Sequence, residues 1–110
     1  MKNIEFIKTF ELEKIEPSEK PKEVKEIFNG TRRRMVQVNL RNREILSKHK
    51  ANEPVTVFCL AGNGTFRAGR DLEDVQKLVA GTLITFEGGV EHEVAAEPEI
   101  SLLVTKFKAE

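Results

Sequence analysis

The sequence predicts an all-β domain, a barrel or a sandwich built from short strands. Two observations carry this prediction: apolar residues alternate in short runs, and turns that contain glycine separate these runs at regular spacing. A chain of 110 residues has the size of one domain and can bury roughly two thirds of its unfolded surface. We therefore expect about six to eight strands around a single core.

The N-terminal part of the chain is expected to differ from the rest. Residues 1–28 are rich in Lys and Glu and contain Pro17 and Pro21, so they predict one early strand followed by a polar loop or a short helix. Asn29-Gly30 then marks a turn. We expect residues 1–31 to pack on a barrel formed by residues 32–110, as a single domain overall.

The first strands of the barrel follow from their apolar patterns. Residues 35–40 alternate between apolar and polar side chains, with Val36, Val38 and Leu40 on one side. Residues 55–61 are almost continuously apolar, as in a strand that is covered on both faces. Gly62-Asn63-Gly64 predicts a hairpin turn, with residues 65–67 as the returning strand.

The remaining elements are separated by charge and by glycine. Residues 70–76 are charged and predict a loop or a helical turn. Gly81 opens a strand that runs to Phe86, and Gly88-Gly89 turns the chain. Two further strands are expected at residues 93–96 and 100–107.

Charge and composition exclude several classes of partner. The chain has 18 basic and 18 acidic residues, so it lacks the net positive charge on which non-specific nucleic-acid binding depends. Its 39% of hydrophobic residues occur in runs far shorter than the roughly 20 residues of a membrane-spanning helix. The cluster Arg32–Arg34, with Arg41 and Arg43 nearby, is expected to alternate on the solvent side of a strand and to pair with glutamates. We expect neither a nucleic-acid nor a membrane partner.

Cysteine usage and the N-terminus indicate the compartment. Cys59 is the single cysteine and cannot form an internal disulfide, and Glu5 stands where a signal peptide would be apolar. A cytoplasmic location is therefore expected. Cys59 itself lies in an apolar run and is expected to be a small buried side chain.

The chain has two histidines, and both lie in recognisable patterns. Gly81, Glu87, Gly89 and His92 have the spacing G-x5-P-x-G-x2-H, with Glu87 in the place of the proline. His49, Ala51, Val55 and Gly62 have the spacing H-x-H-x3-E-x6-G. These are the spacings of the two cupin motifs, and over roughly residues 32–107 the chain resembles a small single-domain, RmlC-like cupin.

The resemblance implies a cupin-type double-stranded β-helix, a jelly-roll barrel preceded by a short polar segment. In metal-binding cupins, the two His and the Glu of the first motif and the His of the second form the ligand set. Here Ala51 and Val55 occupy two of these four positions, so a divalent metal (Zn, Fe, Mn or Ni) would have only His49 and His92 as motif ligands. A third ligand would have to come from Gln37, Glu53 or Glu91, and the absence of any metal is equally compatible with the sequence.

Strand parity places the motif residues around a common space. Together they give a mostly apolar lining with a few polar groups, which is the composition of a small-ligand pocket. A metal site, a metal-free ligand pocket and histidines that are merely packed all remain open. The predicted pocket residues are His49, His92, Gln37, Ala51, Val55, Val57 and Val94.

Three functions are compatible with these patterns. The first is a small cupin of undefined role that binds a small molecule, with or without a metal. The second is a metal-dependent oxygenase or isomerase, although no nucleophile is paired with either histidine. The third is a regulatory or interaction module with a vestigial pocket, and the sequence does not decide whether the protein is an enzyme.

One further prediction concerns the oligomeric state. The strand at residues 55–61 is apolar on both faces, so Phe58 and Leu60 would form an apolar outer surface that favours association. Small cupins commonly dimerise by packing their sheets together. We therefore expect a homodimer with twofold symmetry.

Overall fold

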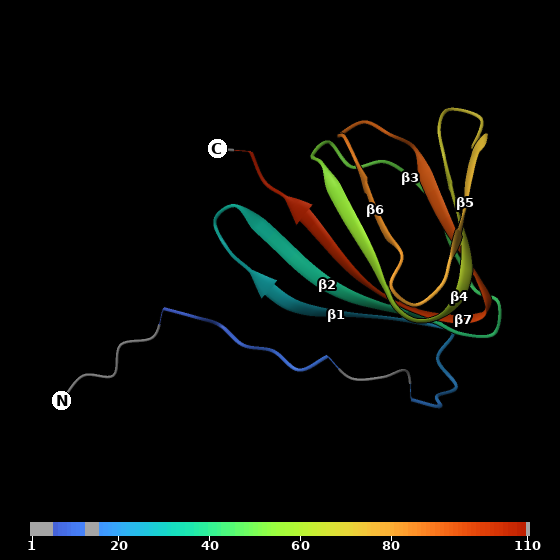
Figure 1. The fold of residues 1–110 in the computed structure, drawn as a ribbon, viewed down its shortest axis with the longest axis horizontal. Coiled ribbons are helices and arrows are strands. Elements are labelled where there is room, and N and C mark those ends of the chain that lie inside the picture. The colour runs from blue at the N-terminus through green and yellow to red at the C-terminus, as the bar shows by residue number, and fades with distance from the viewer. Residues whose placement is uncertain (1–5, 13–15, 110) are drawn as a thin grey trace.

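The computed structural model describes residues 6–12 and 16–109, and this part of the chain is built from strands alone (Figure 1). The all-β prediction is confirmed. None of the described residues forms a helix that is long and apolar enough to cross a membrane. The strands are β1 (Lys22–Asn29), β2 (Arg33–Leu40), β3 (Ile45–His49), β4 (Val55–Ala68), β5 (Asp74–Leu78), β6 (Leu83–Phe86) and β7 (His92–Phe107).

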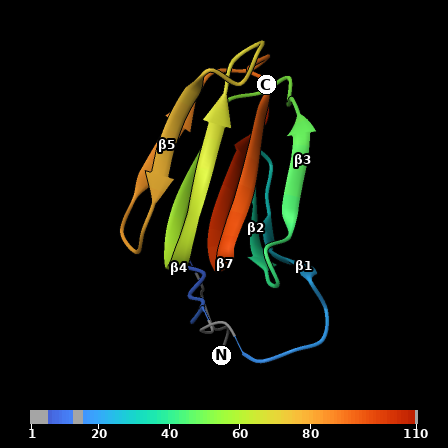
Figure 2. The same ribbon diagram turned by 90° about the vertical axis from the view of Figure 1, so that its right-hand side faces the viewer.

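The two longest strands, β4 and β7, hold the barrel together. They pair antiparallel along nearly their whole length, and bulges between residues 59 and 64 interrupt the register of β4. A bulge bends and twists a strand, so each half of the β4–β7 pair can join a different layer. One half is flanked by β6 and by the β2–β1 hairpin, and the other by β5 and β3. Figure 2 shows the resulting two layers.

The core lies between these layers and follows the alternation in the sequence. Along β7, buried Val94 and Ala96 alternate with more exposed neighbours, and Leu102 and Val104 continue the buried row after the bend. Strands β2, β4 and β7 therefore supply most of the interior through alternate side chains. The buried apolar residues are Val36, Val38, Leu40, Val55, Val57, Cys59, Phe66, Leu78, Val94, Ala96, Ile100, Leu102 and Val104.

The predicted hairpin turn at Gly62-Asn63-Gly64 is wrong. Strand β4 runs through these residues without reversing, and the glycines lie at its bulges. Gly62 has a φ of 84°, and a Cβ there would collide with the carbonyl oxygen of Glu99. This glycine is needed because β4 and β7 approach each other closely, which local sequence cannot distinguish from a turn.

Other boundaries also differ from those predicted. The charged stretch 70–76 was expected to be a loop or a helical turn, but its end belongs to β5, which pairs with β4. The two strands expected at 93–96 and 100–107 are parts of the single strand β7. In both cases, pairing with the long central strands overrides the local signal.

The N-terminal prediction is corrected as well. The early strand fell partly on residues 1–5, which lie outside the described residues, and residues 6–12 form no strand. The first strand, β1, pairs with β2 over almost its full length, so it is part of the barrel sheet rather than a segment packed on it.

Arg41 is buried, contrary to the expectation that it lies on the solvent side. Its guanidinium donates hydrogen bonds to the carbonyl oxygens of Glu16 (3.0 Å) and Lys20 (3.1 Å), and it forms an ion pair with Glu23. A buried cation is tolerated when its donors are paired in this way. Arg41 thereby ties the segment before β1 to the end of β2.

Candidate functional site

The two motif histidines meet across adjacent strands. His49 ends β3 and His92 begins β7, and the two residues are direct partners in the antiparallel register. Their ring centroids are 4.1 Å apart and the rings are inclined by 62°. His92 is only 5% exposed, whereas His49 is exposed. The two motifs therefore form one site.

Backbone contacts fix the orientation and the protonation pattern of both rings. Nδ1 of His49 lies 2.8 Å from the carbonyl oxygen of Ser47, and Nδ1 of His92 lies 3.0 Å from that of Val90. A carbonyl oxygen only accepts, so each Nδ1 must carry a hydrogen and donate it. When the rings are neutral, each Nε2 consequently has a free lone pair.

His92 is held in an aromatic environment. Its ring stacks on Phe66, with centroids 5.9 Å apart, and contacts Phe86 at 4.7 Å. Burial lowers the pKa of His92 below its ordinary value of about 6.5, and electrostatic repulsion from neighbouring His49 and Lys106 adds to this effect. The hydrogen bond to Val90 acts in the opposite direction but does not overcome burial. His92 is therefore neutral at pH 7.

The glycine turn of the second motif packs against the loop of the first. The amide of Gly89 donates a hydrogen bond of 2.7 Å to the carbonyl oxygen of Ala51, and Gly89 has a φ of 85°. A Cβ on Gly88 would collide with the carbonyl oxygen of Asn52. Glycine at position 88 allows the close approach to the loop after His49, and glycine at position 89 allows the positive φ of the turn; both thereby bring the two histidines together.

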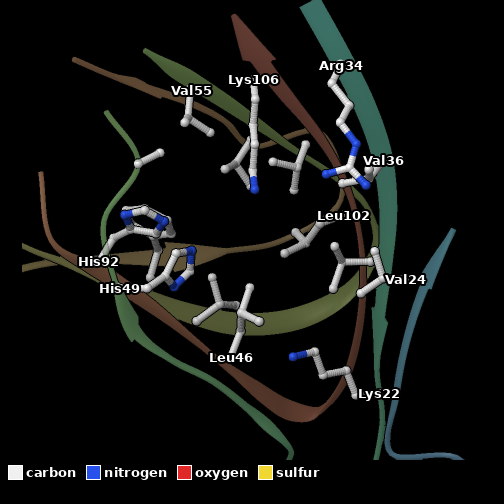
Figure 3. Close-up of a pocket in the computed structure, with 16 residues that line it drawn as sticks. Lys22, Val24, Arg34, Val36, Leu46, His49, Val55, His92, Leu102 and Lys106 are labelled. Carbon is white, nitrogen blue, oxygen red and sulfur yellow. The ribbon is translucent and has the colours of Figure 1, made fainter. Parts of the chain in front are cut away.

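The histidines form one side of a cavity of about 140 Å³ between the two layers (Figure 3). Six of the seven predicted pocket residues line it: His49, His92, Ala51, Val55, Val57 and Val94. The lining also includes Lys22, Val24, Arg34, Val36, Val38, Leu46, Phe66, Leu102, Val104 and Lys106.

Gln37, the remaining predicted pocket residue, does not line this cavity, so that prediction is corrected. Its neighbours Val36 and Val38 face the cavity, and strand alternation turns Gln37 to the opposite side of β2. There its Nε2 donates a hydrogen bond of 2.9 Å to Oγ of Ser101. Gln37 is therefore part of a buried polar network outside the candidate site.

Sequence reasoning missed three basic residues of the cavity, Lys22, Arg34 and Lys106. Their charged ends turn towards the space that the histidines face from the other side (Figure 3). Arg34 was expected on the solvent side of its strand. The missed signal was parity, because Arg34 continues the inward row of Val36 and Val38, just as Lys106 continues that of Leu102 and Val104.

The donor set does not fit a resident divalent metal. Usual metal sites need at least three protein ligands, and the described residues contain no group of three His, Cys, Asp or Glu side chains that could hold one. Glu53 and Glu91, which were considered as third ligands, are not among the residues that line the cavity. Ala51 and Val55, at the motif's other ligand positions, instead form apolar wall. The neighbouring positive charge of Lys106 also disfavours a cation.

Comparison with solved structures identifies the architecture. An RmlC-like cupin protein from Desulfovibrio desulfuricans superposes with a TM-score of 0.77 at 20% identity, over 90% of this chain and 94% of that chain. A cupin superfamily protein from Desulfitobacterium hafniense gives a TM-score of 0.77 at 14% identity, over 86% and 84% of the two chains. The chain has the cupin fold. The predicted double-stranded β-helix is thereby confirmed.

A third cupin structure supports the same conclusion. The RmlC-like protein with a double-stranded β-helix fold from Methanocaldococcus jannaschii gives a TM-score of 0.71 at 17% identity, over 86% of both chains. No family model and no curated protein matches the sequence. The cupin likeness at these identities concerns the fold, so the role of the cavity must be argued from its own residues.

Proposed function

We propose that this cupin binds a small organic molecule in the cavity between His49 and His92. The observation that carries the proposal is a concave, mostly apolar space onto which a few polar groups converge. Its volume of about 140 Å³ is close to that of an engineered protein cavity that holds benzene. The ligand we envisage therefore contains on the order of ten non-hydrogen atoms, with any remainder extending through the mouth.

Filling the cavity tests this proposal. Ala51 is half-buried on the cavity wall, so Ala51→Leu places additional carbons inside the space. We expect small molecules that raise the melting temperature of the wild-type protein in a thermal-shift screen to lose this effect in Ala51→Leu. Ala80→Leu is the matched control, because Ala80 is exposed and does not line the cavity.

The screen has two informative outcomes beyond the expected one. Ligands that stabilise wild type and Ala51→Leu equally bind elsewhere and contradict the proposal. A screen of organic acids, amino acids, sugars and small neutral aromatics without any stabilising compound also contradicts it, and then favours the interaction module with a vestigial pocket.

The metal-dependent enzyme is the second candidate, and one observation favours it. Both Nδ1 atoms donate to backbone carbonyls, an arrangement often found in metal-ligating histidines because it directs the lone pair of Nε2 to the metal. A ligand or water would have to supply the missing coordination. Titration with Zn²⁺ and Ni²⁺, monitored by calorimetry in wild type and in a His49→Ala, His92→Ala double variant, tests it. Binding that requires both histidines would support this candidate, and no binding would remove it.

We also infer a homodimer and a cytoplasmic location. Phe58 and Leu60 are half-buried on the outer face of β4, and Leu83, opposite Phe58 on β6, is 62% exposed. A second copy would cover this apolar surface. Light scattering at tens of micromolar, on the order of usual assay concentrations, is expected to give twice the monomer mass, and a monomer would contradict the inference. The free, buried Cys59 is in keeping with a reducing compartment.

A further inference from the structure

The cavity of this cupin is basic. Three of its lining residues are Lys or Arg, and among the described residues no Asp or Glu lines it. The chain as a whole has equal numbers of acidic and basic side chains, so this imbalance is local. Apolar side chains and basic side chains therefore line the same cavity.

Three neighbouring strands place a cation at a position that faces inward. Lys22 precedes Val24 on β1, Arg34 precedes Val36 on β2, and Lys106 follows Val104 on β7, each two residues from an apolar side chain that lines the same cavity. Because strand side chains alternate, each cation belongs to the inward row. None of the three is fully buried: Lys22 is exposed, the Arg34 side chain is 40% exposed and Lys106 is half-buried, so their charges are accessible to a molecule that enters the cavity.

Two of these cations oppose each other directly. Arg34 and Lys106 are cross-strand partners in the antiparallel register of β2 and β7, and like charges in such a pair repel. Arg34 is partly compensated, because its Nε donates a 2.8 Å hydrogen bond to Glu26, which does not line the cavity. Lys106 and Lys22 also line the cavity, but neither forms a hydrogen bond or an ion pair with any described residue.

From this arrangement we infer that the bound molecule is a small organic carboxylate whose apolar body occupies the wall formed by the valines and whose anionic group lies between Lys106 and Arg34. The inference rests on the proposed function of the cavity and adds the chemical class of its ligand. A carboxylate accepts charge-assisted hydrogen bonds from both cations and removes their repulsion. The wall of Val36, Val57 and Val104 excludes water from one side of these bonds and strengthens them.

Benzoate and benzamide are suitable probes, since they have nearly the same shape and differ in charge. In calorimetric or NMR titrations of the wild-type protein, we expect benzoate to bind about tenfold or more tightly than benzamide. Lys106→Met keeps most of the length of the side chain but removes the charge, so it should abolish most of this preference. Lys106→Gln provides a second, polar variant in case the methionine perturbs the fold.

Lys25→Met is the matched control. Lys25 is an exposed lysine on β1 that does not line this cavity, so its removal changes the net charge equally. We expect the preference for benzoate to survive in Lys25→Met. Equal losses in Lys25→Met and Lys106→Met would mean that only the net charge matters, and would overturn the inference.

The remaining outcomes separate this inference from the proposed function. If benzoate and benzamide bind equally and Ala51→Leu blocks both, the inference of a carboxylate ligand would be overturned, whereas the proposal that the cavity binds a small molecule would stand. If inorganic phosphate binds as tightly as benzoate, with the same dependence on Lys106, the inference that the ligand has an apolar body would be overturned. If neither probe binds while neutral compounds from the thermal-shift screen do, the inference fails; if nothing binds, both proposals fail.

Discussion

The polar side chains on the two faces of β2 differ in the partners that they find within the chain. On the face turned away from the cavity, Gln37 donates to Ser101, and Ser101 donates to Oδ1 of Asn39 at 2.7 Å. On the cavity face, Arg34 opposes Lys106, and these cations repel each other. The first arrangement satisfies polar groups within the chain, whereas the second leaves charge for a molecule from outside. Buried polar groups that are paired within the chain stabilise the fold, whereas partly exposed charges that converge on a cavity are typical of a binding site.

The largest effect on stability is expected on the face where Gln37, Ser101 and Asn39 are hydrogen-bonded to one another. Ser101→Ala removes the acceptor of Gln37 and the donor to Asn39 in a fully buried place, and should lower the free energy of unfolding by about 1–3 kcal/mol. Urea denaturation measures this change. Thr105→Val is the control, because it removes a hydroxyl from the same face of β7 for which no side-chain hydrogen bond is found among the described residues. Equal effects of both substitutions would mean that the network adds no stability.

The cavity face should respond in the opposite direction. Lys106→Met relieves the repulsion from Arg34 and extends the apolar row of Val104, so it should raise the free energy of unfolding of the ligand-free protein by up to about 1 kcal/mol. Added salt screens like charges, so it should stabilise the wild type more than the variant. Denaturation curves at low and high salt measure both effects. A destabilised Lys106→Met would show that the lysine is needed by the fold itself.

The histidine side of the cavity predicts a dependence of stability on pH. The pKa of His92 is lowered in the folded state, so the unfolded chain binds a proton more readily than the native one. The contribution of His92 is therefore complete above the unfolded-state value of about 6.5 and is lost as the pH falls below it. Chemical denaturation between about pH 5 and 7 should show this loss in wild type and a shallower dependence in His92→Asn. Identical slopes would contradict the buried, neutral histidine.

The smallest effect is expected at a satisfied carboxylate on the outside of the barrel. Glu97 accepts hydrogen bonds from Lys77 (3.0 Å) and Thr65 (2.9 Å), and these contacts lower its pKa. Its contribution is present above the ordinary value of about 4.3 and is lost as the pH falls through the lowered value. NMR titration of Glu97 should show the lowered pKa, and Lys77→Met should move it upwards. No change in Lys77→Met would assign the lowered pKa to Thr65 and to the charge of Arg43.

Several features followed from the sequence because they depend on local pattern. Alternating apolar residues predicted the inward faces of β2, β4 and β7, since a strand turns successive side chains to opposite sides. The spacing of Gly81, Gly89 and His92 predicted the cupin fold. Parity also placed Val57 and Val94 around one space with the histidines.

Other features depended on which strands become neighbours. Gly62 was taken for part of a turn because its local signal is the same whether the chain reverses or another backbone approaches closely. Gln37 was placed in the pocket although it has the wrong parity, and Arg34 was assigned to solvent although its parity is inward. In the second case, the general rule that charged residues are exposed outweighed the pattern.

The sequence by itself therefore determined the class of the fold, the motif positions and the apolar rows, because these arise from side-chain periodicity and from the backbone freedom of glycine. Only the tertiary structure decided that His49 pairs with His92, that Arg34 opposes Lys106 and that three separate strands direct cations into one cavity. The physical reason is that charge at a site is a sum over strands distant in sequence. The antiparallel pairing register brings these strands together, and this register cannot be read from any short stretch of the sequence.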